Sequence, residues 1–562
     1  PVPAVMRDGA VLGCALCANG VLAALMVSVL CREPLKHPLT PGQASAAFAY
    51  LVGIFTWLEL EITIELARRF GLPLDCDHLK ASPQETEKIL PVRNGISPHS
   101  DSEEDPDRAC LVIPKSAVKA IRGFAELSAL MILMYICDRT DLVGTGPKHP
   151  SKVQFWGVLA FLLLASFLTL RRTKEADGDT VKPLQREQTE EWKGWMQVMF
   201  LLYHYWVAKE MYNAIRVYIA AYIWMTGFGN FSYYYIKRDF GLPRFAQMMW
   251  RLNFLVVFVC LTLNNEYMLY YICPLHTLFT IMVYGTLYIG SHRNQTDRTF
   301  LVGKMVAVAA ISLVIWDVPG VLDPVWRPLA PLLKYTGDPT VEPKPELMHE
   351  WKFRSKLDHL VWIFGMIVAY NFPRFDAWLT ALDGSAMEPG RPRERFLMIL
   401  GTSVVFVLWF YLVFALDKFS YNLVHPYTSF IPIGCYIVLR NCTRWLREYV
   451  LPAWGEIGKY TLETYICQFH IWMRTTGENG NPKSLLVLVD NFWLNFVVVT
   501  ALYLFVSVRL FKVTVALKEV VLPNDVATIQ TNVFKCLLGC VTVFAVGHAV
   551  HAQSRPPPMS AH

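Results

Sequence analysis

Long stretches without a charged side chain constrain this sequence more than any other feature. A helix of about 18 or more apolar residues is long enough to cross a bilayer, and six uncharged runs reach that length. These runs are 9–31, 153–170, 217–236, 267–291, 396–416 and 491–508. The pattern predicts a polytopic membrane protein.

Eight further segments, 13 to 21 residues long, are also candidates and carry one or two internal polar residues. They are 120–137, 193–210, 245–265, 300–316, 357–372, 427–439, 454–473 and 533–550. We therefore predict an all-α membrane bundle of about 14 transmembrane helices, with 10–14 as the range. Charged residues make up 17% of the chain, against about 25% in soluble domains. This composition excludes a disordered chain, a secreted disulfide scaffold and a coiled coil.

Basic residues lie in short clusters between the apolar runs rather than in one patch, although the net charge is +6. If the 14 segments cross the membrane in alternating directions, six of these clusters lie on the same side of the membrane. The positive-inside bias predicts that this side is cytosolic. Both termini are then predicted to face the lumen. The clusters are Arg32, Arg171–Arg172, Lys237–Arg238, Arg293–Arg298, Arg391–Arg395 and Arg444–Arg447.

Four regions follow from this pattern. Residues 1–31 are predicted to be a transmembrane anchor rather than a cleaved signal peptide, because no small-x-small site precedes Arg32. Residues 32–118 are expected to form a polar, partly disordered cytosolic loop, in which 46–67 is interfacial or loop because it carries three glutamates. Residues 119–551 form the multi-spanning domain. Residues 552–562 are a disordered tail.

Ionisable side chains inside the apolar runs carry the functional argument. An ionised group at mid-bilayer costs about 2.5–3.5 kcal/mol on insertion scales, so such residues are rare and usually functional. Lys193, Gln197 and His204 are spaced four and seven residues apart, which places them on one helix face.

A second stripe is spaced four, three and four residues apart and joins a carboxylate, an imidazole and a guanidinium. It consists of Glu463, Cys467, His470 and Arg474. A third candidate is His276, which follows Pro274. We expect this proline to break the helix near mid-membrane, where a break survives only if the freed backbone lines a cavity or is buried in protein.

The alternative interpretation makes these residues structural contacts between helices. For Lys209, Arg216 and Arg251 we favour it, with partners such as Glu210, Asp239 or Glu266. Three intramembrane histidines nevertheless favour catalysis by at least one of them, because histidine is the usual general base near neutral pH. No hydrolase, NTPase, dinucleotide-binding or zinc motif occurs, so we predict no metal. The 13 cysteines are expected to pack as small apolar side chains.

Long strings of this sequence resemble, in order, the multi-spanning domain of the polysaccharide and sialate O-acetyltransferases. The strings are Gln188–Gln197, Tyr203–Tyr205, Tyr212–Arg216, Trp224–Tyr235, Phe245–Asn253, Tyr270–Thr277, His425–Ser429 and Thr461–Trp472. The resemblance covers about residues 115–550 and is strongest to the plant "reduced wall acetylation" proteins.

This resemblance implies a Golgi membrane enzyme that O-acetylates cell-wall polysaccharides or other glycans, with acetyl-CoA as co-substrate and no permanently bound cofactor. Animal and fungal relatives carry a luminal esterase-like domain with a Gly-Asp-Ser nucleophile, and this sequence has no such motif. A separate luminal acetyltransferase is therefore expected as a partner.

A second resemblance, to the broader acyltransferase-three superfamily, points to His204. That superfamily has a basic residue, then glycine, with histidine eleven positions after the basic residue. Lys193, Gly194 and His204 reproduce this spacing, with lysine in place of the usual arginine, and Tyr465 to His470 is similar to a late Tyr-Leu-x-x-His pattern. His204 is thus the first candidate for the base.

The main hypothesis is an acetyltransferase. Its catalytic residues are drawn from His204, His276, His470, Lys193 and Gln197, and its substrate-binding residues from Arg216, Arg251, Asn253, Glu463 and Arg474. The alternative is a transporter that supplies acetyl-CoA or an acetyl group to a luminal enzyme, since broken helices with buried charges also suit transport.

Overall fold

A computed structural model describes residues 4–32, 38–69, 114–174, 181–337, 346–384, 390–475 and 477–554, with side chains from residue 18 onward. Residues 70–113 of the loop 32–118 that was expected to be partly disordered, and residues 555–562 of the tail 552–562, lie outside the described residues. The chain divides into two compact units. The first comprises 1–132, 515–523 and 530–562, and the second comprises 133–514 and 524–529.

The first unit is built from long helices. They are α1 (Ala4–Arg32), α2 (Pro41–Arg69), the larger part of α3 (Lys115–Arg139) and most of α21 (Val526–Ser554). A small apolar core forms where α1 packs on α2 through Ala23, Val27, Ala44 and Phe48.

Helix α2 corrects the expectation that 46–67 is interfacial or loop. The segment is one continuous helix that is long and apolar enough to cross a membrane. The physical reason is the position of its charges, because 41–58 contains none and the glutamates follow. Asn19 donates to Glu59 Oε2 (2.9 Å), and Arg122 binds both oxygens of Glu61, so two of the glutamates are partnered within this unit.

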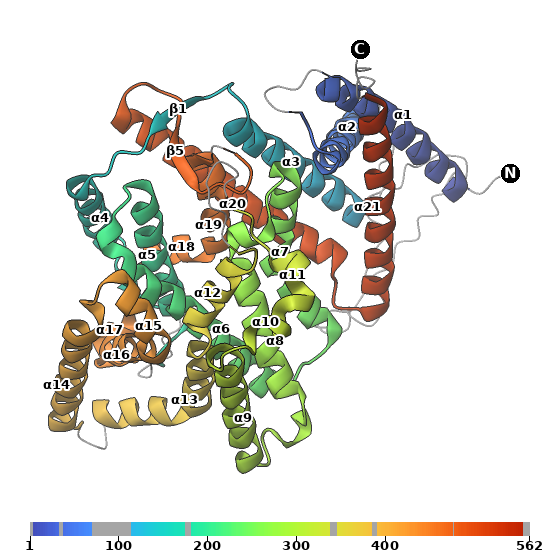
Figure 1. Ribbon diagram of the computed structural model, residues 1–562. Helices are drawn as coiled ribbons and strands as arrows, with labels where there is room; N and C mark the ends of the chain where they lie inside the picture. The colour runs from blue at the N-terminus through green and yellow to red at the C-terminus, as the bar shows by residue number, and fades with distance from the viewer. Residues whose placement is uncertain are drawn as a thin grey trace, which may run out of the picture. The chain divides into compact units, whose positions relative to one another are not determined.

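The second unit contains the remaining helices and two small sheets. Figure 1 labels strands β1 and β5 of the larger sheet. Its helices are α4 (Lys152–Phe167), α5 (Arg186–Tyr205), α6 (Tyr212–Lys237), α7 (Leu242–Leu263), α8 (Ile272–Tyr288), α9 (Arg298–Asp317), α10 (Leu322–Trp326), α11 (Ala330–Leu333), α12 (His349–Asp358), α13 (Val361–Asp383), α14 (Pro392–Trp409), α15 (Lys418–Thr428), α16 (Phe430–Asn441), α17 (Arg444–Glu448), α18 (Pro452–Lys459), α19 (Thr461–Cys467) and most of α20 (Phe492–Val521). Short 3-10 segments lie at η2 (Lys209–Met211), η3 (Tyr267–Tyr270), η4 (Ser291–Arg293) and η5 (Arg327–Leu329), and π-helical segments at η6 (Phe410–Phe414) and η7 (Gln468–Trp472).

The two sheets lie in loops between helices. One has the antiparallel order β1-β5-β4, and the other pairs β2 with β3. The strands are β1 (Gly144–Pro147), β2 (Arg171–Arg172), β3 (Tyr449–Val450), β4 (Met473–Thr475) and β5 (Pro482–Val487). Gly144 pairs with Val487, and Arg171 pairs with Val450, so each sheet joins segments that are far apart in sequence.

Seven helices of the described residues are long and apolar enough to cross a membrane. They are α2, α3, α7, α9, α14 with η6, α20 and α21. The all-helical membrane architecture is confirmed, but the expected count of about 14 spans is not. Several expected spans are shorter or interrupted helices. The expected span 454–473, for example, is divided among α18, α19 and η7.

Pro274 does not break a helix at mid-membrane as expected. It lies in the first turn of α8, directly after η3. The first turn has no intrahelical partner for its N–H groups, so a proline is tolerated there. The chain interruption thus precedes His276 rather than dividing its helix.

Two helix pairs of the second unit approach closely at glycines. A methyl group at Gly227 of α6 would overlap the carbonyl oxygen of Trp362 on α13, and one at Gly194 of α5 would overlap that of Trp454 on α18. Small residues permit such contacts between membrane helices. Gly194, which the sequence placed in an acyltransferase motif, therefore has a packing role beside the predicted site.

Replacing Gly227 with alanine is expected to destabilise the protein by about 1–3 kcal/mol, because α6 and α13 must move apart or strain. Denaturant unfolding in detergent measures the change. Gly229→Ala is the matched control, since nothing lies within 4 Å of a methyl group there and alanine is the better helix former. Equal stabilities of the two variants would contradict the close contact.

Candidate functional site: a cationic cavity beside His204

His204 lies in the last turn of α5. The helix ends at Tyr205, and the chain turns through Val207, whose φ of 53° is rare for a β-branched residue. The His204 Nδ1 lies 2.9 Å from the carbonyl oxygen of Phe200. Since a carbonyl only accepts, Nδ1 carries the hydrogen, and the neutral ring keeps its lone pair on Nε2. Within the described residues, Nε2 has no hydrogen-bond partner.

A cavity of about 320 Å³ lies against His204. Its walls come from widely separated elements of the second unit, including α5, α6, η3, α12, the start of α15 and the loop before β5. The lining residues are Lys148, Phe200, Tyr203, His204, Tyr212, Ile215, Arg216, Ile219, Met268, Leu269, Tyr271, Tyr335, Glu350, Arg354, Lys418, Tyr465, Phe469, Asn481 and Pro482. Charged residues and tyrosines make up more than half of this lining, so the cavity is more polar than the mostly apolar walls of typical small-molecule sites.

Arg216 is the most buried cation of the cavity, with 5% of its surface exposed. Its Nε donates to the Tyr212 hydroxyl at 3.1 Å, and its guanidinium stacks over the rings of Tyr212 and Phe353. The Nη1 atom is buried and has no hydrogen-bond partner in the described structure. A buried cationic donor without a partner is costly, so this atom is a candidate contact for a bound substrate.

Three further cations line the cavity. The Lys148 Nζ donates to the backbone oxygen of His204 at 3.1 Å. Lys418 lies over the ring of Tyr212. Arg354 donates to Glu350 Oε2 at 2.9 Å and is thereby paired.

Burial changes the ionisation of two cavity residues, Lys148 in the loop after β1 and Glu350 at the start of α12. It lowers the pKa of Lys148 to about 8, because the charged ammonium loses hydration. It also raises the pKa of the Glu350 carboxyl, against the opposing effect of nearby His349, Arg216 and Lys418. The cavity therefore carries its full positive charge at and below neutral pH and loses one charge as Lys148 deprotonates.

We expect Lys148 to titrate near pH 8 rather than at the ordinary lysine value of about 10.4. The residue is charged below this midpoint and neutral above it. Carbon-13 NMR of the reductively dimethylated protein measures the midpoint, and Lys148→Arg assigns the signal by removing it. A midpoint above about pH 10 would contradict the buried position.

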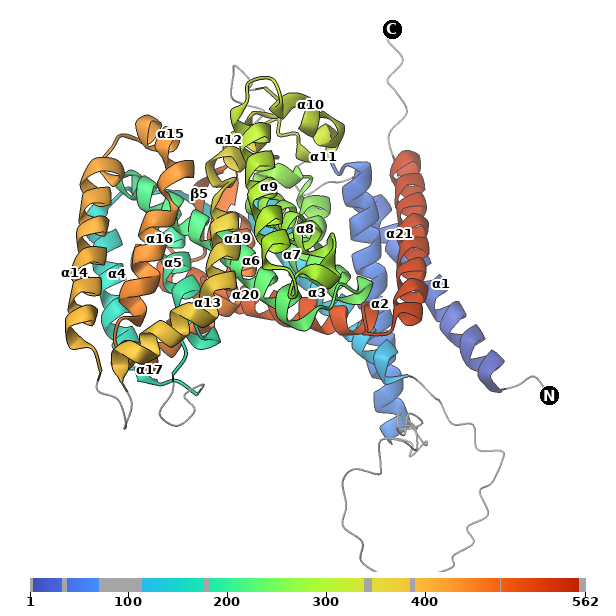
Figure 2. The same cartoon turned by 90° about the horizontal axis from the view of Figure 1, so that it is seen from below.

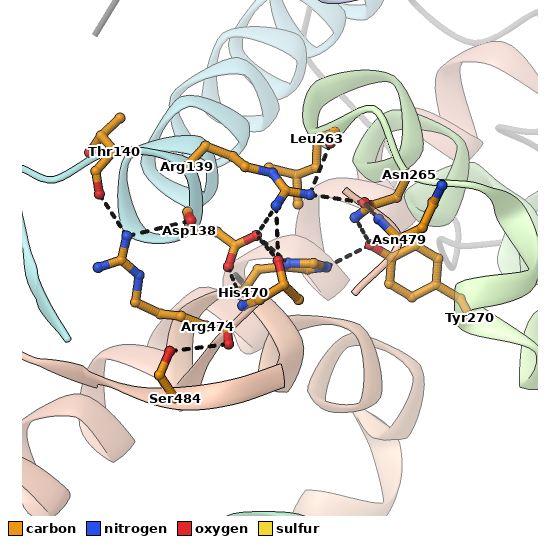
Figure 3. A network of polar contacts seen from close by, with 11 residues as sticks. Asp138, Arg139, Thr140, Leu263, Asn265, Tyr270, His470, Arg474, Asn479 and Ser484 are labelled. Carbon is orange, nitrogen blue, oxygen red and sulfur yellow. Dashed lines mark hydrogen bonds and ion pairs between the residues drawn. The ribbon is translucent and has the colours of Figure 1, made fainter. Parts of the chain in front are cut away.

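His470 lies outside this cavity, in a buried network (Figure 3). Its Nδ1 contacts Asp138 Oδ2 at 3.0 Å, and its Nε2 lies 2.6 Å from the Tyr270 hydroxyl. His470 and Asp138 are at most 4% exposed. Both ring nitrogens are therefore engaged. Phe469, the preceding residue, lines the cavity, so the network supports its wall.

The expected stripe from Glu463 to Arg474 is not one helix face. Helix α19 ends at Cys467, the π segment η7 follows, and Arg474 lies in strand β4. A π segment shifts the helical register. Arg474 instead donates to the backbone oxygens of Thr140 (2.6 Å) and Val143 (2.9 Å) beyond the end of α3.

Glu463 forms a bidentate ion pair with Arg251, with contacts of 2.5 and 3.0 Å. The carboxylate partner of Arg251 is therefore Glu463 rather than Glu210, Asp239 or Glu266, the partners expected for it. Arg216 has no carboxylate partner in the described residues, unlike the structural ion pair expected for it.

The remaining predicted residues lie away from His204. Lys193 and His204 are eleven residues apart on α5, about 16 Å along the axis, so they do not meet. Gln197 is buried, donates to Thr464 and accepts from Tyr222.

Asn253 and His276 also have partners within the bundle. Asn253 donates to Thr277 (3.0 Å) and accepts from Tyr267 (2.5 Å). His276 Nδ1 lies 2.6 Å from the Thr226 hydroxyl. Neither lines the cavity.

Sequence reasoning missed Lys148, Glu350, Arg354 and Lys418 as site residues. Each is an ordinary charged residue in a loop or short helix between apolar runs. Their one common signal is a position just outside expected spans, which many surface residues share.

The described residues contain no group of three His, Cys, Asp or Glu side chains that could hold a metal ion. Nine described cysteines are free thiols, most of them buried. The Cys14–Cys17 pair lies where side chains are not described.

Comparison with known proteins places the chain in a family. Residues 82–534 match the family model described as a 10 TM acyl transferase domain found in Cas1p. The chain is 31% identical over 430 residues to the N-acetylneuraminate (7)9-O-acetyltransferase of Danio rerio, and the match covers 73% of this chain and 52% of that protein. The chain thus spans about half the length of this curated relative. No solved structure matches. The chain therefore belongs to the family of 10-TM acyltransferase domains that includes sialate O-acetyltransferases.

Proposed function

We propose that this protein transfers an acetyl group from acetyl-CoA to a glycan hydroxyl in the cavity beside His204. The observation that carries the proposal is the state of that histidine. Its Nδ1 is fixed by the Phe200 carbonyl, and its Nε2 has no partner in the described structure while the residue lines a cavity. This arrangement prepares Nε2 to accept a proton.

The reaction needs one proton acceptor and one donor for the developing oxyanion. Nε2 of His204 takes the proton of the acceptor hydroxyl as its oxygen attacks the thioester carbonyl. The tetrahedral oxyanion then collapses, the C–S bond breaks, and the thiolate of CoA takes the proton back from the imidazolium. Arg216 Nη1, which is buried beside the same cavity without a partner, donates to the oxyanion. Such a donor is typically worth about 3–4 kcal/mol.

The biological setting is part of the proposal. We assign the chain to the reduced wall acetylation branch, in the Golgi membrane, acting on cell-wall polysaccharide with a separate luminal acetyltransferase as partner. The support is the set of matching sequence strings given above and the relationship to a sialate O-acetyltransferase. If donor and acceptor lie on opposite sides of the membrane, the transfer takes two steps instead of one. Nε2 of His204 attacks the thioester carbonyl, and the C–S bond breaks with release of the CoA thiolate. The acceptor hydroxyl then attacks the acetyl group on the ring, the N–C bond breaks, and the hydroxyl proton passes to water.

The competing function is transport, which interrupted helices such as η3–α8 and α19–η7 also suit. Purified protein in detergent, given radiolabelled acetyl-CoA and soluble sugars, should release free CoA and form acetyl esters. Sealed proteoliposomes provide the second measurement. Accumulation of intact acetyl-CoA inside them, without CoA release or ester formation in detergent, would overturn the proposal in favour of transport.

A further inference from the structure

Helix α5 ends one residue after His204, where the last backbone carbonyls of a helix have no intrahelical partner. The N–H groups that follow the helix donate to the carbonyls of Leu202 and Tyr203 at 3.0 and 3.1 Å. The carbonyl of His204 is bound differently, because the Nζ of Lys148 donates to it at 3.1 Å. A lysine that lies 56 residues earlier in the chain thus completes the end of this helix.

Lys148 reaches this carbonyl from a short segment that is fixed at both ends. On one side, β1 pairs with β5 up to Pro147. On the other side, Ser151 caps the first turn of α4, and Gln154 of that helix accepts from the indole N–H of Trp206 at 2.9 Å. Figure 2, like Figure 1, shows α4 beside α5. This segment therefore holds Lys148 next to the end of α5.

We propose that Lys148 is a positioning residue for the transfer reaction, because its ammonium group holds the backbone of His204 and thereby keeps the imidazole against the cavity. The inference rests on the proposed function, in which His204 is the base. The Phe200 carbonyl fixes the ring through Nδ1 at 2.9 Å, and Lys148 fixes the backbone. Together the two contacts restrain both ends of the residue.

The positive charge of Lys148 strengthens its contact with the helix. A hydrogen bond from a charged donor is about twice as strong as a neutral one, and a cation at the C-terminal end of a helix also interacts favourably with the helix dipole. Burial lowers the pKa of Lys148 to about 8. The contact therefore keeps its full strength below that pH and weakens above it.

The other titratable groups of the cavity do not replace this contact. Among the described lining residues the carboxylate is that of Glu350, which pairs with Arg354 at 2.9 Å. In the described structure the ammonium of Lys148 makes its hydrogen bond to the His204 carbonyl. The remaining titratable lining residues are Tyr203, His204, Tyr212, Arg216, Tyr271, Tyr335, Lys418 and Tyr465.

Steady-state kinetics of the purified protein test the inference. Lys148→Met should lower kcat by about 10- to 100-fold, the range for a hydrogen bond to a charged group and for a misplaced catalytic group, and leave the KM for acetyl-CoA unchanged. Lys148→Arg should restore most of the rate, because a guanidinium also donates to a carbonyl. Lys152→Met is the matched control, since Lys152 lies at the start of α4 with a 76% exposed side chain and does not line the cavity.

The pH profile separates positioning from a merely structural role. Wild-type kcat should fall above about pH 8, as Lys148 loses its proton, toward the rate of Lys148→Met. Lys148→Arg should keep its rate in this range, because arginine stays charged. Lys152→Met should follow the wild type.

A measurement without turnover reports on the histidine directly. Solid-state nitrogen-15 NMR of histidine-labelled protein detects the tautomer of the ring, and His204→Ala assigns its signals by removing them. Wild type and Lys148→Arg should show the Nδ1–H tautomer alone, because the Phe200 carbonyl accepts from Nδ1. Lys148→Met should show a mixture of tautomers, because the ring is released from this carbonyl.

Three results would overturn the inference. They are an unchanged kcat in Lys148→Met, a raised KM without a fall in kcat, which would make Lys148 a substrate-binding residue, and a single tautomer retained in Lys148→Met. A wild-type protein that forms no ester and releases no CoA, but shows the tautomer difference, would instead reject the acetyltransferase and retain the role of Lys148 in holding His204.

Discussion

Replacing His204 with alanine is expected to lower the rate of acetyl transfer by about 10²–10⁴-fold, the usual contribution of a general base. The expectation follows from the geometry, in which the Phe200 carbonyl fixes Nδ1 and leaves Nε2 to accept a proton at the cavity. Ester formation and CoA release by purified protein measure the change. Abundance in the membrane and unfolding in detergent should stay close to wild type, because the ring makes only this one hydrogen bond.

His292→Ala is the control, since His292 is exposed in η4 and does not line the cavity. His276→Ala and His470→Ala complete the comparison. Transfer that survives in His204→Ala but is lost in His276→Ala, with folding intact, would assign the base to His276. A loss of activity in His470→Ala is expected only together with a loss of stability, because both of its ring nitrogens have structural partners.

Replacing Asp138 with alanine is expected to cause a large loss of stability. Its Oδ2 accepts from His470 Nδ1 and the Thr475 hydroxyl (2.7 Å), its Oδ1 accepts from the Thr475 N–H, and the guanidinium of Arg139 lies 3.6 Å away. Asp138→Ala removes one member of a buried charged network and leaves the others without a partner. Such a loss costs about 3–5 kcal/mol.

Denaturant unfolding in detergent measures this cost. Asp490→Ala is the matched control, because Asp490 is exposed and a surface substitution usually stays within about 0.5 kcal/mol. Asp138→Asn retains one acceptor oxygen and should lie between the two. A loss below about 1 kcal/mol in Asp138→Ala, the size of a surface ion pair, would show that the network in Figure 3 contributes little to stability.

Local properties of the chain were readable without the structure. Helix α14 with η6 coincides closely with the uncharged run 396–416, because lipid leaves a backbone no alternative to internal hydrogen bonding. The same reasoning did not predict that α2 is a helix long and apolar enough to cross a membrane. Three glutamates argued against a membrane helix, yet they follow an 18-residue uncharged half, and two of them have partners on α1 and α3.

The prediction that residues 463–474 share one helix face was wrong because the α-helix ends within that segment. The stripe from Glu463 to Arg474 assumed a constant 3.6-residue period, and η7 followed by β4 ends that period after Cys467. No sequence pattern in residues 461–475 predicts a π-helical segment. It is set by tertiary contacts, among them the fixing of His470 between Asp138 and Tyr270, which are 332 and 200 residues away in sequence.

The sequence by itself determined that this protein is a helical membrane protein of the O-acetyltransferase type, and it selected His204 as the first candidate base. The hydropathy that predicts the helices and the motif that points to His204 each depend on residues that are close together in sequence, so both can be recognised without the fold. Only the tertiary structure decided what surrounds that histidine. Lys148, Arg216 and Lys418 come from separate loops and helices, and long-range packing, including close glycine contacts between helices, brings them to one cavity. The charge of the site is therefore a property of the fold.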